Sequence, residues 1–454
     1  MEPKGRDAPR PLRVVIVGGG ASGALVATNL LREGRTGLEI VVVEPREVLG
    51  EGIAYSTRDP WHRLNVPVIV MSALSGDPEH FLRWSGDRPE AFARRVDYGR
   101  YIREVLAEAV AGSPAALRHV VGTAERIEPT ENGVRVTLAG GEAMLGDAVV
   151  LATGFETPFE LPYLRGLAGD PRVVTDPWAA GALDAIRDGE QLAVIGSSLT
   201  AIDLAGSILN RHPRASIVAL SRHGRLPRSH EDPWRPRLPE PAFTVDEFLG
   251  FDDPLGEAAE RLRGFGVDWP RAVDSIRPIF PSLWMAMGDD LRREFLDDYR
   301  NEWEIHRHRI AAEIARDVDG WIAEGRMAVH PAAIEAIEPE DGRLRIRAKP
   351  DGDVAPASWI VDRVFVAIGP DPDARANPLL GAAIADGIAR PGPMGIAIDV
   401  DPATGLVIDA GGQTQLPVYA IGALRKGVLW ETIAVPEIRE QAAQTARRIL
   451  DAAV

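Results

Sequence analysis

The chain of 454 residues contains no cysteine. This absence excludes disulfide bonds, thiolate metal sites and a dithiol redox relay. If the protein carries out redox chemistry, its electrons must therefore pass through a bound cofactor.

Long apolar runs and an excess of positive charge are also missing. No segment reaches the roughly 18 consecutive apolar residues of a transmembrane helix, and the stretch MEPKGRDAPRPLRVVIVGGG has an apolar run too short for a signal peptide. The formal net charge of -16 opposes binding to a nucleic-acid backbone. We therefore expect a cytoplasmic protein of two or three domains that binds neither membrane nor nucleic acid.

A phosphate-binding fingerprint stands near the start of the chain, in LRVVIVGGGASGALVATNLLREG. A β-branched strand leads into Gly18-x-Gly20-x-x-Gly23, and apolar residues at helical spacing follow. The glycines allow a tight turn, close approach of a pyrophosphate, and close packing of helix on strand. A diphosphate would then lie on the unpaired N–H groups of the helix N-terminus. The candidate contacts are Gly18, Gly20, Ala21, Ser22 and Gly23.

The next expected strand, LEIVVVEP, ends at Glu44, followed by Pro45. Glu44 lies about 20 residues beyond the fingerprint, where a carboxylate accepts hydrogen bonds from an adenosine ribose and repels a 2′-phosphate. This site is therefore predicted to bind FAD or NAD rather than NADP. A later strand is expected in DAVVLATGFETP, from Asp147 to Pro158. Gly154, near the end of this strand, is a further candidate contact.

A second turn of this kind occurs in LAVIGSSLTAIDLAG, residues 192 to 206, but a serine replaces its middle glycine. The next strand ends at Arg222, whose permanent charge suits a 2′-phosphate. We interpret the turn as an NADPH site, in preference to NADH, with its affinity reduced by the serine. A turn that is kept for packing after its ligand was lost stays the alternative. The candidate contacts are Gly196, Ser197, Ser198, Ala201 and Arg222.

A glycine turn and a long amphipathic helix are expected near the C-terminus, in LPVYAIGALRKGVLWETIAVPEIREQ. Gly422 follows a strand, Thr432 is a candidate N-cap, and Pro436 falls in the first helical turn. This helix N-terminus could face the pyrimidine side of a flavin, with Gly422, Glu431 and Thr432 as candidate contacts. An ordinary amphipathic helix is the alternative.

Together these stretches resemble FAD/NAD(P)-binding proteins that are distantly related to N-hydroxylating and Baeyer-Villiger flavin monooxygenases. Further matching stretches are GEGIAYSTRDPWHRLNVPVIVMS, LSRHGRLPRSH, WEIHRHR and VAIGP. The resemblance implies an α/β fold with two Rossmann-like three-layer dinucleotide-binding domains. The FAD domain would comprise residues 1–175 and 331–454, with an NAD(P)H domain and a helical extension inserted at 176–330.

Two positions depart from the pattern of this family. Ser198 replaces a glycine, and Ala423 stands where many relatives place an aspartate that holds the ribityl chain of FAD. The ribityl contact is therefore unassigned.

By the same resemblance, the stretch from Gly50 to Met71 carries the isoalloxazine. We expect Asn65 to be the catalytic side chain beside the reactive flavin atoms, and a local turn cap is the alternative for it. The candidate flavin contacts in this stretch are Ala54, Tyr55, Leu64, Asn65, Val66 and Met71.

The stretch WEIHRHRIAAEI does not have metal-ligand spacing. In a helix, His306 and His308 would point to different faces, and Trp303, Arg307, Ile310 and Ile314 form a better helical stripe. We expect a packed helix and no metal site, and a contact of Arg307 or His308 with substrate or nicotinamide stays open. The proline-rich segment from Pro227 to Pro281 either walls a substrate cavity or packs on the surface, and no internal repeat is visible.

The expected function is that of an FAD-dependent oxidoreductase reduced by NADPH. Without a dithiol, dioxygen is the expected electron acceptor, and the resemblance implies N-hydroxylation of a small amine through a C4a-hydroperoxyflavin. A flavin oxidase or dehydrogenase with a vestigial second turn and a non-enzymatic flavin-bound sensor are the alternatives. Substrate identity and homo-oligomer formation are left open.

Overall fold

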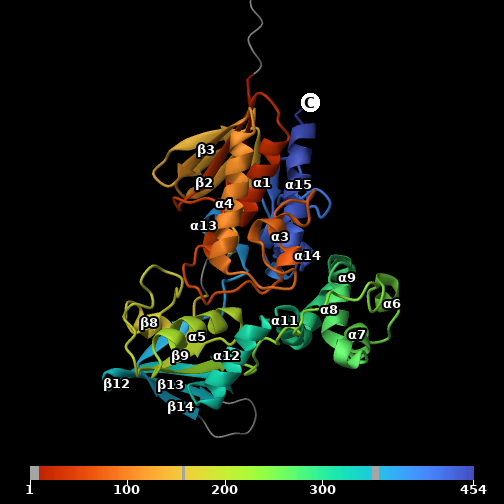
Figure 1. The fold of residues 1–454 in the computed structure, drawn as a ribbon. Helices are drawn as coiled ribbons and strands as arrows, with labels where there is room; N and C mark the ends of the chain where they lie inside the picture. Colours follow the sequence, from red (N-terminus) through yellow and green to blue (C-terminus); the bar gives the residue numbers. More distant parts are fainter. Residues whose placement is uncertain (1–9, 156–158, 350–356, 454) are drawn as a thin grey trace, which may run out of the picture.

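The computed structural model describes residues 10–155, 159–349 and 357–453. Glu156, Thr157 and Pro158, the last residues of the ATG stretch, and residues 1–9 of the N-terminal stretch lie outside the described residues. The described chain forms two five-stranded parallel sheets, each with helices on one face and a three-stranded antiparallel sheet on the other (Figure 1). The expected pair of three-layer α/β domains is therefore confirmed.

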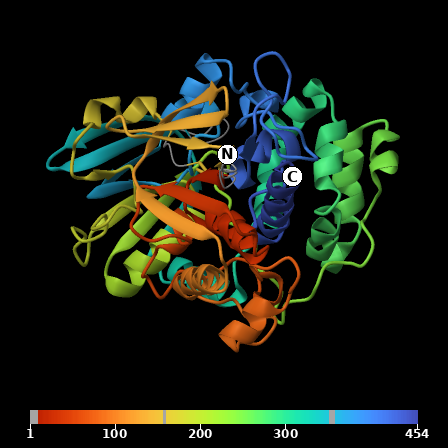
Figure 2. The same ribbon diagram turned by 90° about the horizontal axis from the view of Figure 1, so that it is seen from above.

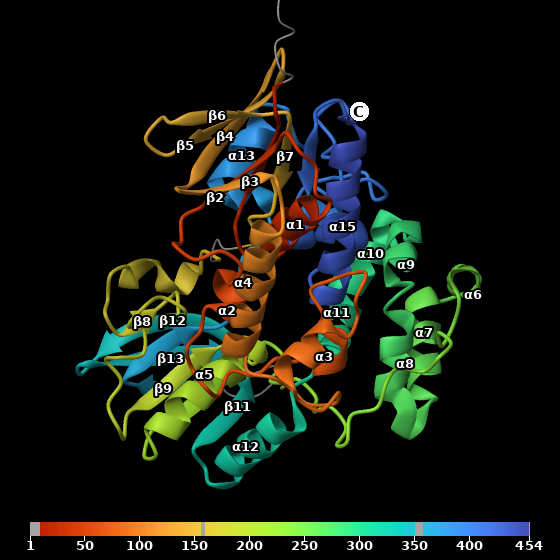
Figure 3. The ribbon, with the colours of Figure 1, turned by 45° about the horizontal axis from the view of Figure 1, so that its top comes forward.

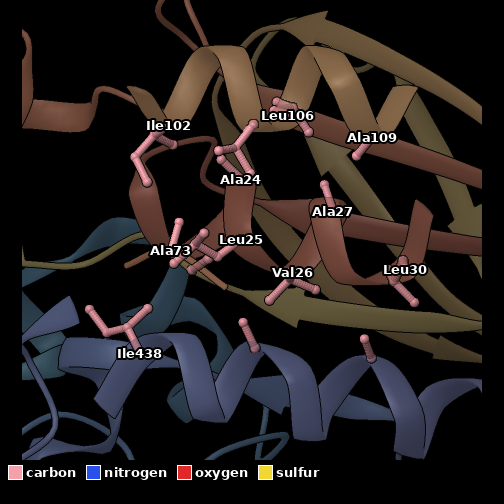
Figure 4. Close-up of a cluster of buried hydrophobic side chains, with 14 of the residues drawn as sticks. Ala24, Leu25, Val26, Ala27, Leu30, Ala73, Ile102, Leu106, Ala109 and Ile438 are labelled. Carbon is pink, nitrogen blue, oxygen red and sulfur yellow. The ribbon is translucent and has the colours of Figure 1, made fainter. Parts of the chain in front are cut away.

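The first sheet has the strand order β16-β7-β1-β2-β3. Its strands are β1 (Leu12–Val17), β2 (Leu38–Glu44), β3 (Ala116–Val121), β7 (Ala148–Leu151) and β16 (Val418–Ala420). Helices α1 (Ala21–Arg32), α4 (Arg95–Ala111) and α15 (Val435–Asp451) cover one face, and α1 lies between the other two (Figure 4). The other face is covered by α13 (Pro378–Ala385) and by the strands β4 (Ala124–Thr130), β5 (Gly133–Leu138) and β6 (Ala143–Gly146).

The alternation of side chains along β1 explains why both faces are covered. Val14 and Ile16 pack into the core beneath the helices, whereas Val15 and Val17 pack into the core beneath the antiparallel strands. Successive side chains of a strand point to opposite faces, so a continuous apolar strand needs an apolar layer on each side.

The second sheet has the order β11-β10-β9-β15-β8. Its strands are β8 (Val173–Val174), β9 (Gln191–Ile195), β10 (Ser216–Ser221), β11 (Met327–Pro331) and β15 (Arg363–Val366). Helices α5 (Leu199–Arg211) and α12 (Ala312–Ala323) cover one face. The strands β12 (Ala333–Glu340), β13 (Arg343–Lys349) and β14 (Ala357–Val361) cover the other.

The two units repeat the same order of elements. The series β1, α1, β2, α4, β3, antiparallel strands, β7 corresponds to the series β9, α5, β10, α12, β11, antiparallel strands, β15. The sequence showed no internal repeat, because side chains in the two units share only their apolar pattern and turn glycines.

The sheet to which each strand belongs shows where the chain passes from one unit to the other. The chain leaves the first sheet after β7 and returns only after β15, since β12 to β15 all pack with the second sheet. The return therefore lies beyond Val366 and not at the expected position 330/331.

Between β10 and α12 the chain forms a group of helices that is separate from the second sheet (Figures 2 and 3). We call it the helical group; it comprises α6 (Val245–Leu249), α7 (Pro254–Arg263), α8 (Trp269–Ile276), α9 (Phe280–Ala286), α10 (Asp289–Glu294), the π-helical turn η4 (Phe295–Tyr299) and α11 (Arg300–Arg307). It has its own apolar core, which includes Trp430 from the C-terminal segment. The indole N–H of Trp284 donates to Gly427 O at 2.8 Å, so the helical group is fixed to that segment.

The remaining short helices are α2 (Gly52–Tyr55), η1 (Val68–Val70), α3 (His80–Ser85), η2 (Pro162–Leu167), η3 (Gly266–Asp268), η5 (Ala374–Ala376), η6 (Pro393–Gly395), η7 (Gly422–Arg425) and α14 (Lys426–Leu429). Among the described residues, no helix is both long enough and apolar enough to cross a membrane.

Candidate functional site

The first fingerprint turn connects β1 to α1 as the sequence predicted. Gly18 has a φ of 100°, and a Cβ on it would lie 2.5 Å from Ala152 O at the end of β7. A Cβ on Gly23 would lie 1.9 Å from Gly18 O. Both glycines are therefore required by the turn itself, whereas a Cβ on Gly20 would meet only Gly52, at 3.4 Å.

The turn presents a free helix N-terminus. Gly20 is the N-cap residue of α1, no side chain caps the helix, and its first turn holds no acidic residue. The first N–H groups of a helix have no partner within the helix, so those at Ala21, Ser22 and Gly23 can receive an anion. The geometry fits a pyrophosphate.

Glu44 lies at the end of β2, beside this turn, and is 3% exposed. Its Oε2 accepts the Gly19 N–H at 2.7 Å, and its Oε1 accepts from Arg46 Nη1 at 3.0 Å. These bonds hold the carboxylate at the position from which a ribose would be bound. Pro45, which follows it, is exposed.

The end of β7 forms the neighbouring wall of this turn. Ala152 contacts the position of Gly18, and Gly154 has a φ of 67°, which favours glycine. A Cβ on Gly154 would meet no described atom within 4 Å, so the backbone here is open on that side.

The second turn has nearly the same backbone conformation as the first. Gly196 has a φ of 114°, and a Cβ on it would lie 2.4 Å from Ala367 O at the end of β15, which matches Gly18 and Ala152. Ser198 has φ −91° and ψ −162°, and the equivalent Gly20 has φ −65° and ψ −168°. Because this φ is negative, serine adopts it without strain. The structure thus explains how the turn tolerates a serine.

The two serines of the turn have different surroundings. Ser198 is the N-cap residue of α5, is exposed, and its hydroxyl does not cap the helix. Ser197 is 7% exposed, and its Oγ donates to Arg225 O at 2.6 Å and lies 2.8 Å from Ser221 Oγ. Ser197 therefore holds the loop after β10, while the hydroxyl of Ser198 stays available to a ligand. Ala201 is buried inside α5.

Arg222 follows the last residue of β10, and its side chain is exposed. The structure records no ion pair between this guanidinium and another described residue. Its neighbour Arg225 pairs with Glu302 on α11. The guanidinium of Arg222 is thus available to a ligand at the end of β10.

The expected isoalloxazine stretch begins at α2, whose Gly52 lies against Gly20 of the first turn. The ring of Tyr55 packs on Tyr98, with centroids 4.7 Å apart, and burial raises the pKa of Tyr55 to about 12. Ala54 is exposed. This ring is therefore a neutral phenol at any working pH and serves as packing surface beside the turn.

Within residues 64–71 the apolar side chains have a structural role. Leu64 and Met71 are buried in the core beneath α1, α4 and α15, and Val66 packs against that core. The Leu64 N–H donates to Ala93 O at 2.8 Å. The side chains of Leu64 and Met71 therefore anchor this segment to the hydrophobic core.

Asn65 is half-buried, and a histidine from the inserted region holds its main chain. His230 Nε2 donates to Asn65 O at 3.0 Å. His230 is 9% exposed, and burial, assisted by the Arg309 charge, lowers its pKa to about 4. Sequence reasoning missed this contact, because LPRSH carries no signal that would pair it with residue 65.

Gly422 and Thr432 lie at the other side of the first turn. A Cβ on Gly422 would lie 2.9 Å from Ser22 Oγ. The Gly422 N–H donates to Gln441 Oε1 at 2.9 Å, and Gly422 O accepts from Thr432 Oγ1 at 3.2 Å. Thr432 is not the N-cap of α15, because Ala434 occupies that position; its hydroxyl instead joins Gly422 to Gln441. Pro436 lies in the first turn, as expected.

The carboxylate of Glu431 forms a buried ion pair within the protein. It is 5% exposed, and its Oε2 accepts from Arg307 Nε at 3.0 Å and from Nη2 at 2.9 Å, while its Oε1 accepts from Trp303 Nε1 at 3.2 Å. Arg307 is equally buried. Neither charge is free to contact a ligand, so this pair fixes α11 to the C-terminal segment.

The expected single helix through WEIHRHRIAAEI is interrupted. Helix α11 ends at Arg307 and α12 begins at Ala312, and between them Ile310 forms backbone bonds with Arg228 and His230. His306 pairs with Glu302 at 3.2 Å, and His308 pairs with Glu304 at 2.9 Å. The two imidazoles thus face different carboxylates.

A polar network joins the C-terminal half of α5 to the loop that follows α2. Asp59 Oδ2 accepts from Ser207 Oγ at 2.6 Å and from Arg211 Nη2 at 2.7 Å. His62 Nε2 lies 2.8 Å from Ser207 Oγ, and burial lowers the pKa of His62. Helix α5, which starts at the second turn, is therefore fixed to the loop that follows α2.

Comparison with known proteins agrees with this architecture. Residues 15–156 match a protein family described as FAD-NAD(P)-binding. No curated protein matches the sequence.

Several solved structures match nearly the whole chain. An ornithine hydroxylase from Pseudomonas aeruginosa matches with a TM-score of 0.66 and 16% identity, over 98% of this chain and 100% of that one. The ornithine N-hydroxylase of Kutzneria sp. 744, in a structure with reduced FAD, NADP+ and L-ornithine, matches with a TM-score of 0.66 and 14% identity, over 98% and 100%. A bacillithiol disulfide reductase from Staphylococcus aureus matches with a TM-score of 0.57 and 14% identity, over 98% and 99%.

The chain therefore has the fold of N-hydroxylating flavin monooxygenases and related flavoprotein reductases. The resemblance inferred from the motifs is confirmed at the level of fold, and residues 15–156 are similar to an FAD-NAD(P)-binding family.

Proposed function

We propose that this chain, whose residues 15–156 match a FAD-NAD(P)-binding family, is an FAD-dependent oxidoreductase that is reduced by NADPH and N-hydroxylates a small amine. The observation that carries the proposal is the repeated unit. Two turns of nearly equal conformation each lead into a helix without an acidic residue in its first turn. Each is a ready site for a diphosphate.

The residues that follow each turn assign the two cofactors. Glu44, buried beside the first turn, suits the free ribose hydroxyls of FAD. Arg222, exposed at the end of β10, suits the 2′-phosphate of NADPH. When bound, FAD supplies hydride acceptance and activation of dioxygen.

The chain's own residues would hold the flavin and orient the groups around it. Gly422 brings the C-terminal segment against Ser22 in the first turn of α1. His230 holds the main chain of Asn65, so that the Asn65 amide can be positioned beside the reacting atoms. The buried side chains beneath residues 64–71 keep water out of this side of the site, as oxygen insertion requires.

Dioxygen is the proposed electron acceptor because the chain has no cysteine with which to reduce a disulfide. The ornithine-hydroxylating relatives also match with higher TM-scores than the disulfide reductase does. The reaction balances as amine, NADPH, a proton and dioxygen giving hydroxylamine, NADP+ and water.

The test is a screen of small amines for oxygen uptake that depends on both NADPH and the amine, with the hydroxylamine measured as product. We expect one hydroxylamine for each NADPH oxidised with the correct amine. If a metabolite instead reduces the flavin anaerobically without NADPH, the protein is an oxidase or dehydrogenase. If no reductant acts, it is a flavin-bound sensor.

A further inference from the structure

The helical group forms a partly open cavity that none of the expected dinucleotide contacts lines. Its volume is about 80 Å³, and its walls are almost wholly apolar. They include Phe248, Leu262, Val273 and Trp303 from different helices. A water molecule needs roughly 10–15 Å³ on this scale, so the space is large enough for several such groups.

Two polar groups at this cavity lack partners. Trp269 lines it, and the indole Nε1 of Trp269 is buried with no hydrogen-bond partner among the described residues. His306, which is 4% exposed and also lines the cavity, has an unpartnered Nδ1. The two rings lie together, with centroids 3.8 Å apart. Buried donors are normally paired, and an indole N–H can only donate, so this end of the cavity favours a hydrogen-bond acceptor.

The helix that carries much of the wall is locally distorted. Residues Phe295–Tyr299 form a π-helical turn between α10 and α11, and both end residues line the cavity. Such turns are rare and occur often at functional sites, since they redirect side chains that a regular helix would turn away. The distortion therefore shapes the cavity wall.

Charge near the cavity disfavours an anion. Glu302 lines the cavity and lies 3.2 Å from His306 Nε2, with Arg225 as its other partner. Arg225 pairs with Glu302, whereas Arg263, which also lines the cavity, has no ion pair with a described carboxylate. The carboxylate of Glu302 lies beside the Trp269–His306 end and repels an anion there, so this end favours a neutral acceptor.

We propose that this cavity binds a small apolar molecule, a ring or short acyl chain, that carries one neutral hydrogen-bond acceptor such as a carbonyl oxygen. The acceptor would bond to Trp269 Nε1, and the apolar part would fill the space between α7, α8 and α11. The proposal does not depend on the proposed redox activity.

The test uses calorimetric titration of the full-length protein with benzamide, which carries a ring and a carbonyl, and with ethylbenzene, which lacks the acceptor. We expect benzamide to bind about fivefold more tightly, the typical effect of one hydrogen bond. Trp269→Phe should remove this preference, and Trp234→Phe, outside the cavity, should keep it.

A second variant, Ala258→Phe, fills the cavity from α7 and should abolish binding of both probes. The proposal is overturned if neither probe binds the wild-type protein, or if binding persists in Ala258→Phe. It is also overturned if Trp269→Phe keeps the preference for benzamide. If Ala258→Phe does not fold, the Trp269→Phe result decides alone.

Discussion

The contact between His230 and Asn65 makes the stability of the protein depend on pH in a calculable way. Burial, followed by the nearby Arg309 charge, lowers the pKa of His230 from 6.5 to about 4. Between these two pKa values, His230 is therefore protonated in the unfolded chain and neutral in the folded chain. This stability is fully present above the unfolded pKa and is lost as the pH falls toward the folded pKa.

The size of the effect follows from the two pKa values. Between about pH 8 and about pH 5, the proton taken up by unfolded His230 should cost the folded state about 2 kcal/mol. His230→Gln removes this titration and keeps an N–H donor near the position of Nε2. The variant should therefore gain about 2 kcal/mol of stability relative to the wild-type protein over this pH interval.

The assay is urea unfolding of both proteins at the two pH values, followed by tryptophan fluorescence and far-UV circular dichroism. Coincident transitions would show that two-state analysis applies. Burial also lowers the pKa values of His62 and His306, but their contributions cancel in the difference between the two proteins. A difference that stays constant from high to low pH would refute the buried, neutral state of His230.

The remaining predictions concern the turns and the C-terminal clamp. Arg222→Ala should raise the KM for NADPH at least about tenfold and leave that for NADH nearly unchanged; equal losses would refute a role in binding the 2′-phosphate. Gly20→Ala should weaken FAD binding without unfolding the protein, because a Cβ there meets only Gly52 at 3.4 Å, and the matched control Gly76→Ala should change nothing; equilibrium dialysis of FAD measures both. Glu431→Gln should lower the free energy of unfolding by about 3–5 kcal/mol, because it leaves Arg307 buried without its counter-ion; a loss below about 1 kcal/mol in urea unfolding would contradict the role of this pair.

Local sequence patterns predicted the parts of the site that depend on neighbouring residues. The requirement for Gly18 and Gly23 follows from contacts within one strand, turn and helix, so the fingerprint was enough to predict it. Glu44 at the end of β2 followed from the same unit. The second turn was recognised for the same reason, and the structure adds that serine adopts the negative φ of position 198 without strain.

The contacts that the sequence did not predict join residues far apart in the chain. Glu431 was expected at the cofactor, but Arg307 and Trp303 neutralise and bury it. Thr432 was expected to cap α15, yet its hydroxyl bonds to Gly422 and Gln441. Each of these outcomes depends on how α11 and the C-terminal segment pack, and no local pattern encodes that packing.

The architectural repeat was also invisible in the sequence. Both units keep the strand, turn and helix, but the second carries the helical group where the first carries residues 45–94. The two insertions meet at His230 and Asn65, which places the proposed reaction centre between the repeated units. Only the order of strands in the two sheets reveals this correspondence.

The central claim is that both turns bind cofactors and that electrons pass from the second to the first. The most direct measurement is to load the protein with FAD, remove oxygen, add NADPH, and follow the visible flavin band. The account predicts rapid bleaching by NADPH, slower bleaching by NADH, and loss of the NADPH advantage in Arg222→Ala. A flavin that stays oxidised with NADPH, both alone and with each amine of the screen, would contradict it.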